Sequence, residues 1–174
     1  MTFKDYFEVI DFSPLYKTLK SLHVFHNELA ENTGKLRHHV QALFNKTRLT
    51  DTQFIFDAAK ELQCNISDIV EFKDIKPRYS IMSVPPKKDS KLSYKRFLAN
   101  IEYWKGKPAR ELLEEVETRD IDYKLGILPE ITEITDRTLN YDMIKHILNN
   151  ETVSVTILYD ICKHFNCYPD DVIA

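Results

Sequence analysis

Apolar residues recur at helical spacing along most of this 174-residue chain. Ser13-Pro14 has the residue types of a helix start, so we expect a first helix from that point. Short second and third helices are predicted over residues 26–33 and 36–44, separated by Gly34, a residue type that ends helices in the left-handed conformation. The positions expected to face the core of these three helices are Leu15, Leu19, Leu22, Leu29, Ala30, Leu36, Val40, Leu43 and Phe44.

A fourth helix is predicted to begin after Asp51, whose side chain can cap it, and to run through Leu62. Phe54, Ile55, Ala58, Ala59 and Leu62 mark its buried face. A short helical turn over residues 67–70 completes a five-helix unit, and residues 1–12 are expected to form an arm or a capping segment.

The end of this unit occurs a second time at the C-terminus of the chain. Residues 62–70 (LQCNISDIV) match residues 165–173 (FNCYPDDVI). Four identical pairs share one constant offset: Asp57/Asp160, Lys60/Lys163, Cys64/Cys167 and Asp68/Asp171. We therefore predict two copies of one helical unit. The first two helices of the second copy are not at the first copy's spacing, which indicates an insertion or a rearranged entry.

These patterns predict an all-α fold with an N-terminal domain over residues 1–72, a linker over 73–91 and a C-terminal domain over 92–174. Paired prolines and polar residues in 85–90 are typical of a linker, and residues 78–84 are candidates for a short extended segment. Tyr94, Phe97, Leu98, Ile101 and Trp104 share one face of the helix expected to open the C-terminal domain.

Composition narrows the class of protein. The net charge is −3, so any case for nucleic-acid binding must come from local charge. Only three glycines are present, and no glycine-rich phosphate-binding loop occurs.

The odd number of cysteines, three, favours free thiols in a reducing compartment. Without an apolar leader or an apolar run long enough for a membrane span, we expect a cytoplasmic protein that does not enter the membrane.

Local charge is concentrated around the third predicted helix. Residues 35–48 carry Lys35, Arg37, Lys46 and Arg48 and no acidic residue, a local charge of +4. If Val40 and Leu43 face inward, the outer face of this helix carries Arg37, His38, His39 and Gln41. Arginine pairs with guanine and glutamine with adenine in the major groove, so this face has the chemistry of a DNA reader.

Residues 26–34 (HNELAENTG) resemble the second helix of the phage-repressor-like (Xre) helix-turn-helix family. Residues 65–72 and 153–162 resemble the end and the fourth helix of one subgroup, so the resemblance covers residues 13–72 and 131–174 but not 73–130. It implies two tandem helix-turn-helix units that dock the third helix of a unit in the major groove, usually as homodimers on double-stranded DNA.

The resemblance also implies roles for individual residues. His26 and Asn27 would lie near a phosphate, Arg37 and His38 would face bases, and Asn45 and Lys46 would contact the DNA backbone. The candidate DNA-binding residues are therefore His26, Asn27, Lys35, Arg37, His38, His39, Gln41, Asn45, Lys46 and Arg48.

The second copy departs from the family pattern. Thr138 replaces the turn glycine, and residues 137–151 balance two basic against two acidic side chains. This copy is therefore expected to form a partner or dimer surface rather than to read DNA. Lys35 is a departure in the first copy, because an apolar residue is usual at that position.

Catalytic and metal-binding alternatives have little support in the sequence. His38 and His39 are adjacent, so they point in different directions from a helix, and the spacing of Cys162 and Cys167 fits core thiols better than a zinc site. We expect no cofactor, no metal and no enzyme activity. The leading hypothesis is a sequence-specific DNA-binding transcriptional regulator that acts by occupying an operator.

The alternative is a protein-binding module, such as a phage- or plasmid-encoded inhibitor or antirepressor that keeps the helix-turn-helix fold. The locally acidic stretch 107–123 and the departures in the second copy motivate it, because acidic surfaces can mimic nucleic acid.

Overall fold

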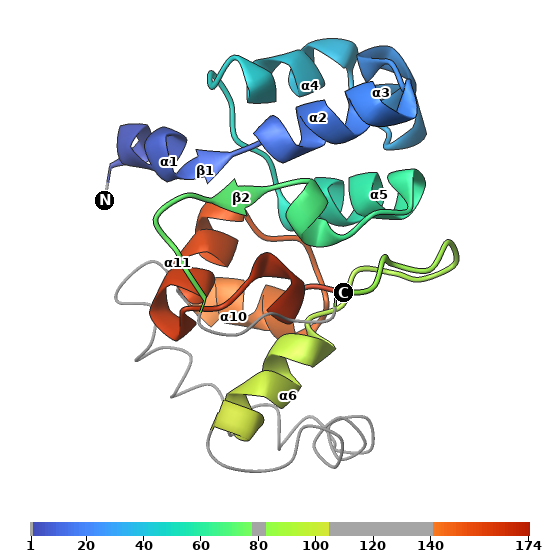
Figure 1. Cartoon of the computed structure of the whole chain (residues 1–174). Coiled ribbons are helices and arrows are strands. Elements are labelled where there is room, and N and C mark those ends of the chain that lie inside the picture. Colours follow the sequence, from blue (N-terminus) through green and yellow to red (C-terminus); the bar gives the residue numbers. More distant parts are fainter. Residues whose placement is uncertain (1, 78–82, 105–140) are drawn as a thin grey trace.

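The computed structural model describes residues 2–77, 83–104 and 141–174, and it is mostly helical (Figure 1). The described elements are α1 (Phe3–Val9), β1 (Ile10–Asp11), α2 (Ser13–Leu22), α3 (His26–Asn32), α4 (Arg37–Phe44), α5 (Thr52–Leu62), η1 (Ile66–Asp68), β2 (Glu71–Phe72), α6 (Lys95–Trp104), α10 (Tyr141–Leu148), α11 (Val155–Phe165) and η2 (Pro169–Asp171). The prediction of a mainly helical chain is confirmed.

The structure also has one small two-stranded sheet, which the prediction of an all-α fold did not include. β1 pairs antiparallel with β2, with Ile10 opposite Phe72 and Asp11 opposite Glu71. Residues 1–12 thus form α1 and one strand, and this strand closes the beginning of the first unit onto its end. The Lys73 ammonium lies 3.1 Å from the Asp11 carboxylate, which adds an ion pair beside the sheet.

Local sequence explains where the helices of the first unit begin and end. Pro14 lies in the first turn of α2, where its missing N–H costs nothing. α3 ends at Asn32, Gly34 follows with a left-handed φ of 68°, and the Lys35 N–H donates back to the Ala30 carbonyl at 2.7 Å. The Asp51 carboxylate accepts from the Phe54 N–H at 2.8 Å, so the predicted cap of α5 is confirmed.

Two core predictions for the first unit are wrong. Leu22 is 49% exposed at the end of α2, and Leu36 is 67% exposed because it is the N-cap of α4 and precedes the helical face. The predicted positions that are buried are Leu15, Leu19, Leu29, Ala30, Val40, Leu43, Phe54, Ile55, Ala58 and Ala59. Phe44 and Leu62 are partly buried against them.

The second half repeats the elements of the first. α2 covers residues 13–22 and α6 covers residues 95–104. The two helices therefore have the same length and are offset by 82 positions. α10 has the length of α4, and α11 has the length of α5. Between α2 and α4 lie 14 residues, 23–36, whereas 36 residues, 105–140, lie between α6 and α10. The extra length of the second copy therefore falls outside the described residues, as do residues 107–123 and Thr138.

Corresponding hydrogen bonds hold corresponding elements in both copies. The Thr18 hydroxyl of α2 donates to the Asp68 carbonyl at 3.1 Å, and the Asn100 amide of α6 donates to the Asp171 carbonyl at 2.9 Å. The turns after α4 and α10 also agree, because Lys46 and Asn150 both have a left-handed φ, 55° and 57°. The sequence repeat is thus also a repeat of contacts.

The two copies meet through equivalent segments. Asp51 and Ser154, the N-caps of α5 and α11, form an antiparallel bridge. The Thr52 N–H donates to the Val153 carbonyl at 2.8 Å, and reciprocally the Val155 N–H donates to the Thr50 carbonyl at 3.0 Å. η1 also contacts η2. This reciprocity defines a pseudo-two-fold axis between the copies.

Segments outside the repeats join the two halves. The Tyr6 ring of α1 meets the Tyr159 ring of α11 edge-on at 5.7 Å, and the Tyr6 hydroxyl donates to the Asp160 carboxylate. Residues 83–91 run past α5, where Lys60 and Gln63 donate to the backbone carbonyls of Ser90 and Pro86. One continuous buried cluster includes residues of both halves. The domain limits at residues 72 and 92 stay a prediction, and the predicted extended segment falls largely on residues 78–82, outside the described part.

No helix in the described part of the chain combines the length and the apolar character needed to span a lipid bilayer.

Candidate nucleic-acid interface

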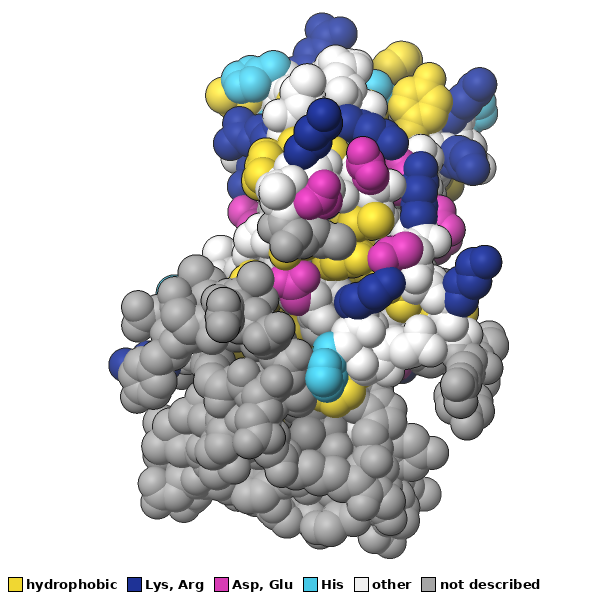
Figure 2. Space-filling view, turned by 90° about the vertical axis from the view of Figure 1, so that its left-hand side faces the viewer, with side chains coloured by type: hydrophobic (Ala, Val, Ile, Leu, Met, Phe, Trp, Pro, Cys, Tyr) yellow, Lys and Arg dark blue, Asp and Glu magenta, His cyan; other side chains and the backbone are white. Residues whose placement is uncertain are grey.

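α3 and α4 pack against each other at one end of the molecule (Figure 1). Leu29 and Ala30 of α3 and Val40 and Leu43 of α4 are buried, so the opposite sides of both helices face solvent. Figure 2 shows Lys and Arg side chains over this end, with acidic side chains closer to the middle of the molecule. The sequence agrees, because residues 13–50 hold six Lys or Arg and two Glu, whereas residues 51–77 hold three Lys and six Asp or Glu.

The first turn of α4 presents two of the predicted base-reading residues. Arg37 and His38 are both exposed, and no described residue forms an ion pair with Arg37. Their side chains are therefore accessible to a ligand. Asn27, predicted to lie near a phosphate, is exposed in the first turn of α3.

Gln41 links the two helices on their exposed side. The His26 Nδ1 lies 3.2 Å from the Gln41 Oε1, and the Gln41 amide donates to the Asn45 Oδ1 at 3.3 Å. The His26 ring is also placed against the Phe44 ring, at 4.9 Å between centroids. His26, Gln41 and Asn45 were predicted to contact different parts of the DNA. In the structure they form one chain of hydrogen bonds, which fixes the direction of the Gln41 side chain.

His39 corrects the predicted outer face. It is only 7% exposed, and its Nε2 lies 3.1 Å from the hydroxyl of buried Thr50. Burial lowers the pKa of His39, and the neighbouring cations Arg48 and Lys35 lower it further. His39 lies one helical turn before buried Leu43, on the edge of the face that holds Val40 and Leu43, whereas His38 lies about 200° from Val40 and faces solvent. His39 is therefore a core residue.

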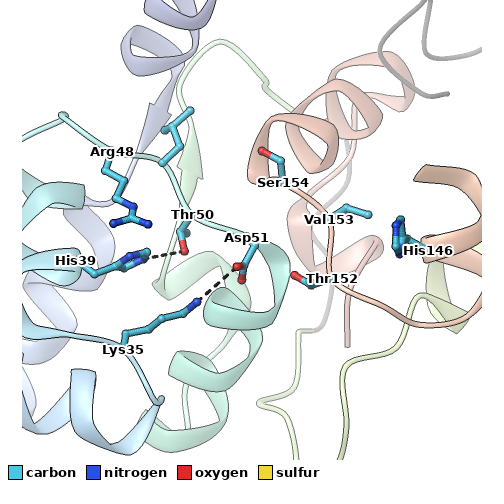
Figure 3. Close-up of a pocket in the computed structure, with 10 residues that line it drawn as sticks. Lys35, His39, Arg48, Thr50, Asp51, His146, Thr152, Val153 and Ser154 are labelled. Atoms are coloured by element: carbon cyan, nitrogen blue, oxygen red, sulfur yellow. Dashed lines mark hydrogen bonds and ion pairs between the residues drawn. The ribbon is translucent and has the colours of Figure 1, made fainter. Parts of the chain in front are cut away.

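Lys35 and Arg48 border an open cleft of about 360 Å³ that lies between the two copies (Figure 3). The Lys35 ammonium is 3.6 Å from the Asp51 carboxylate, and both side chains are about one-third exposed. Asp51 therefore compensates part of the predicted local charge of +4. Arg48 is exposed, and no described residue forms a hydrogen bond or ion pair with its side chain. The far side of the cleft is formed by His146, Thr152, Val153 and Ser154.

The turn after α4 carries the remaining candidates. Asn45, Lys46 and Arg48 are exposed, and Lys46 adopts the left-handed conformation two residues after α4 ends at Phe44. Non-glycine residues seldom occupy this conformation, and asparagine does so more readily than lysine. The second copy has Asn150 at this position, so the lysine of the first copy is not required by the turn itself.

The corresponding turn in the second copy has a different charge. The His146 ring and the Glu151 carboxylate are in close contact, and residues 149–154 contain no Lys or Arg. Asn149 and Asn150 stand where the first copy has Asn45 and Lys46. Within the described residues, the cationic character of the first copy's turn is thus not repeated.

Sequence reasoning missed two exposed apolar side chains beside the candidate residues. Phe25 is 72% exposed and Leu36 is 67% exposed, and they are the N-caps of α3 and α4. A residue that immediately precedes a helical face is not held against the core, so counting from the helix start could have found both. They add apolar contact area to a surface that is otherwise polar.

Other chemistry is sparse in the described part of the chain. No group of three or more histidine, cysteine or acidic side chains there has a metal-binding arrangement. The three cysteines are free thiols, Cys162 and Cys167 buried and Cys64 half-buried, and burial raises the pKa of Cys64 to about 12. The Cys64 thiol is therefore protonated at neutral pH.

Comparisons with known proteins add no relative to this description. No family model matches the chain, no curated protein matches it, and no solved structure matches it. The function must therefore be argued from the residues described above.

Proposed function

We propose that the chain is a sequence-specific DNA-binding transcriptional regulator that acts by occupying an operator, with α3 and α4 as the helix-turn-helix of its reading unit. The observation that carries the proposal is the exposed row formed by Arg37, His38 and Gln41 on α4, followed by Lys46 and Arg48 in the next turn. On this reading the regulator has no catalytic chemistry, and it works in the cytoplasm.

The exposed residues fall into two groups, one suited to contact bases and one suited to contact phosphates. Arg37 and Gln41 are one helical turn apart, so both can reach base edges from a helix lying in the major groove. The contacts of His26 and Asn45 hold Gln41 in place, which lowers the entropy lost on binding. Lys46, Arg48 and Asn27 lie outside the base-reading turn and would contact phosphates, which orient the protein without reading sequence.

The first experiment measures discrimination. After selection of bound sequences from random duplexes, mobility-shift titrations compare the selected duplex with a scrambled one. Arg37→Ala is expected to cost about 1–3 kcal/mol on the selected duplex only, which is roughly a 5- to 150-fold loss of affinity. Lys76→Ala, which removes an exposed cation outside α3 and α4, serves as the charge-matched control. Unchanged discrimination in Arg37→Ala would contradict this docking.

The second experiment separates phosphate contact from base reading. Lys46→Asn introduces the residue that the second copy carries in the same turn, so the left-handed conformation is kept while the charge is removed. It should weaken selected and scrambled duplexes alike and reduce the slope of log affinity against log salt by about one contact. If Lys46→Asn lowered the affinity for the selected duplex only and left the salt slope unchanged, Lys46 would be a base-reading residue instead.

A second candidate function is a protein-binding module, such as a phage- or plasmid-encoded inhibitor or antirepressor. The exposed Phe25 and Leu36 favour it, because large apolar side chains at helix starts are typical of protein contacts. Genomic footprinting separates the two candidates, since a pure protein binder protects no DNA. Phe25→Ser with Leu36→Ser should then abolish partner binding while leaving the fold intact.

A further inference from the structure

We propose that one chain is a complete DNA-binding unit, with its two copies taking the place of the two subunits of a homodimer, and that it binds a single non-palindromic site. This inference rests on the proposed function, and it replaces the homodimer implied by the family resemblance.

The contact between the copies has the form of a symmetric subunit interface. In such an interface the same segment lies on both sides, and each contact occurs twice with the partners exchanged. Residues 50–52 and 153–155 meet in this way, through the Asp51–Ser154 bridge and the reciprocal hydrogen bonds of Thr52 and Val155. The contact of η1 with η2 is a second pairing of equivalent segments.

This pairing surface is not open to a second chain. Thr52, Val153 and Val155 are at most 4% exposed. The Thr52 hydroxyl accepts from the Val153 N–H at 3.0 Å and bonds to the Tyr94 hydroxyl at 2.6 Å, so side chains complete the backbone pairing. The axis by which two copies of the unit would associate is therefore already occupied within one chain.

Both copies border the same face of the molecule. The cleft on the axis is lined by Lys35, His39 and Arg48 from the first copy and by His146 and Thr152 from the second (Figure 3). A duplex contacted by Arg48 would therefore also pass Thr152, which lines the other side of this cleft. The second copy lacks the cations of the first at this point, since Asn150 replaces Lys46 and residues 151–154 contain no Lys or Arg.

The unequal copies predict an unequal site. The half of the DNA site near α4 should be bound in a sequence-specific manner, whereas the half near α10 should make only weak contacts. The chain should have the mass of a monomer, 20.5 kDa, and form a complex with one chain per duplex. The selected sequence should show one conserved half-site without an inverted repeat.

The decisive experiment measures the mass of the full-length chain by sedimentation equilibrium, alone and with the selected duplex. A monomer and a one-to-one complex are expected, and a stable species of twice the monomer mass or a two-to-one complex on a palindrome would overturn the proposal. The measurement without DNA does not depend on the function. If the chain bound no DNA, the proposed function would be wrong. Its measured mass would still show whether two chains associate.

A matched pair of variants tests whether the second copy meets the duplex. Thr152 is exposed and lines the cleft opposite Arg48. Thr152→Arg should tighten binding several-fold and steepen the salt dependence by about one contact, whereas Thr152→Glu should weaken binding by a similar factor. Equal affinities of the two variants would show that DNA does not cross the axis, and would overturn the single-chain site.

Discussion

Asp51 and Ser154 pair with each other across the pseudo-two-fold axis, and each also caps the helix that follows it. The Asp51 carboxylate accepts from the Phe54 N–H at 2.8 Å, and the Ser154 hydroxyl accepts from the Thr156 N–H at 3.3 Å. The residues that join the copies are thus the residues that start their central helices.

Loss of the Asp51 cap should destabilise the chain. Asp51→Ala leaves an N–H of α5 without its acceptor, and we expect the free energy of unfolding to fall by about 1 kcal/mol in urea titrations. Asp51→Ser is the matched control, because the second copy caps with serine, and its cost should be a few tenths of a kcal/mol. An equal loss in both variants would assign the effect to the Lys35 ion pair.

The Thr52 hydroxyl should be costly to remove. Thr52→Val keeps the shape but deprives the Val153 N–H of an acceptor and the Tyr94 hydroxyl of its partner, and both groups are buried. With about 1–3 kcal/mol for each of the two buried unsatisfied groups, we expect a loss of about 2–6 kcal/mol. Adding Tyr94→Phe should restore part of it in a double-mutant cycle. Strict additivity of the two substitutions would argue against the hydrogen bond.

His39 should make stability depend on pH. Its folded pKa lies below the ordinary value of 6.5, so the unfolded chain binds a proton first as the pH falls. The stability contributed by neutral His39 is present above pH 6.5 and is lost progressively as the pH falls toward the folded pKa. Other groups near the ring, namely Lys35, Arg48, His38 and Asp51, stay in place in His39→Gln.

Unfolding of His39→Gln and of the unaltered chain should therefore be compared between pH 7 and pH 5. The unaltered chain should lose more stability over this interval than the variant does. Parallel curves would show that the His39 pKa is not lowered by folding.

The Tyr6 hydroxyl should fasten α1 to the second half of the chain. It lies 3.0 Å from the nearer Asp160 oxygen, and burial together with this carboxylate raises the Tyr6 pKa to about 12. Tyr6→Phe should lower the unfolding free energy by about 1–2 kcal/mol and speed proteolysis within α1. Tyr16→Phe removes a hydroxyl from a half-exposed ring and should change stability by less than about 0.5 kcal/mol. Equal effects would contradict the bond to Asp160.

Features decided by neighbouring residues were predictable from the sequence. The Asp51 cap, the left-handed Gly34 and the length of α5 each depend on contacts within a few positions, and all three agree with the structure. The repeat was visible for the same reason, because two of its four identities lie within α5 and α11 and the other two lie in the turns directly after them. The correspondence of α6 to α2 was not visible in the sequence, because the two helices share no identical residue at the offset of 82 positions.

Features decided by distant contacts were not predictable. The face of α4 was assigned correctly for Arg37, His38 and Gln41 and wrongly for His39, because Thr50 supplies the buried partner that makes an inward histidine tolerable. Leu36 was taken as core although it precedes the helix. The pairing of β1 with β2 brings together residues from opposite ends of the first unit, and no local pattern marks it.

The sequence by itself determined the helices, their caps and the presence of two copies, since these follow from side-chain periodicity and short-range hydrogen bonds. Only the tertiary structure decided how the copies face each other. The Asp51–Ser154 bridge forms between backbone groups, which every residue carries, so its location depends on the packing of Thr52, Tyr94 and Val155 around it. That packing also decides which cations remain exposed, because it places Asp51 beside Lys35 and leaves Arg37, Lys46 and Arg48 facing solvent.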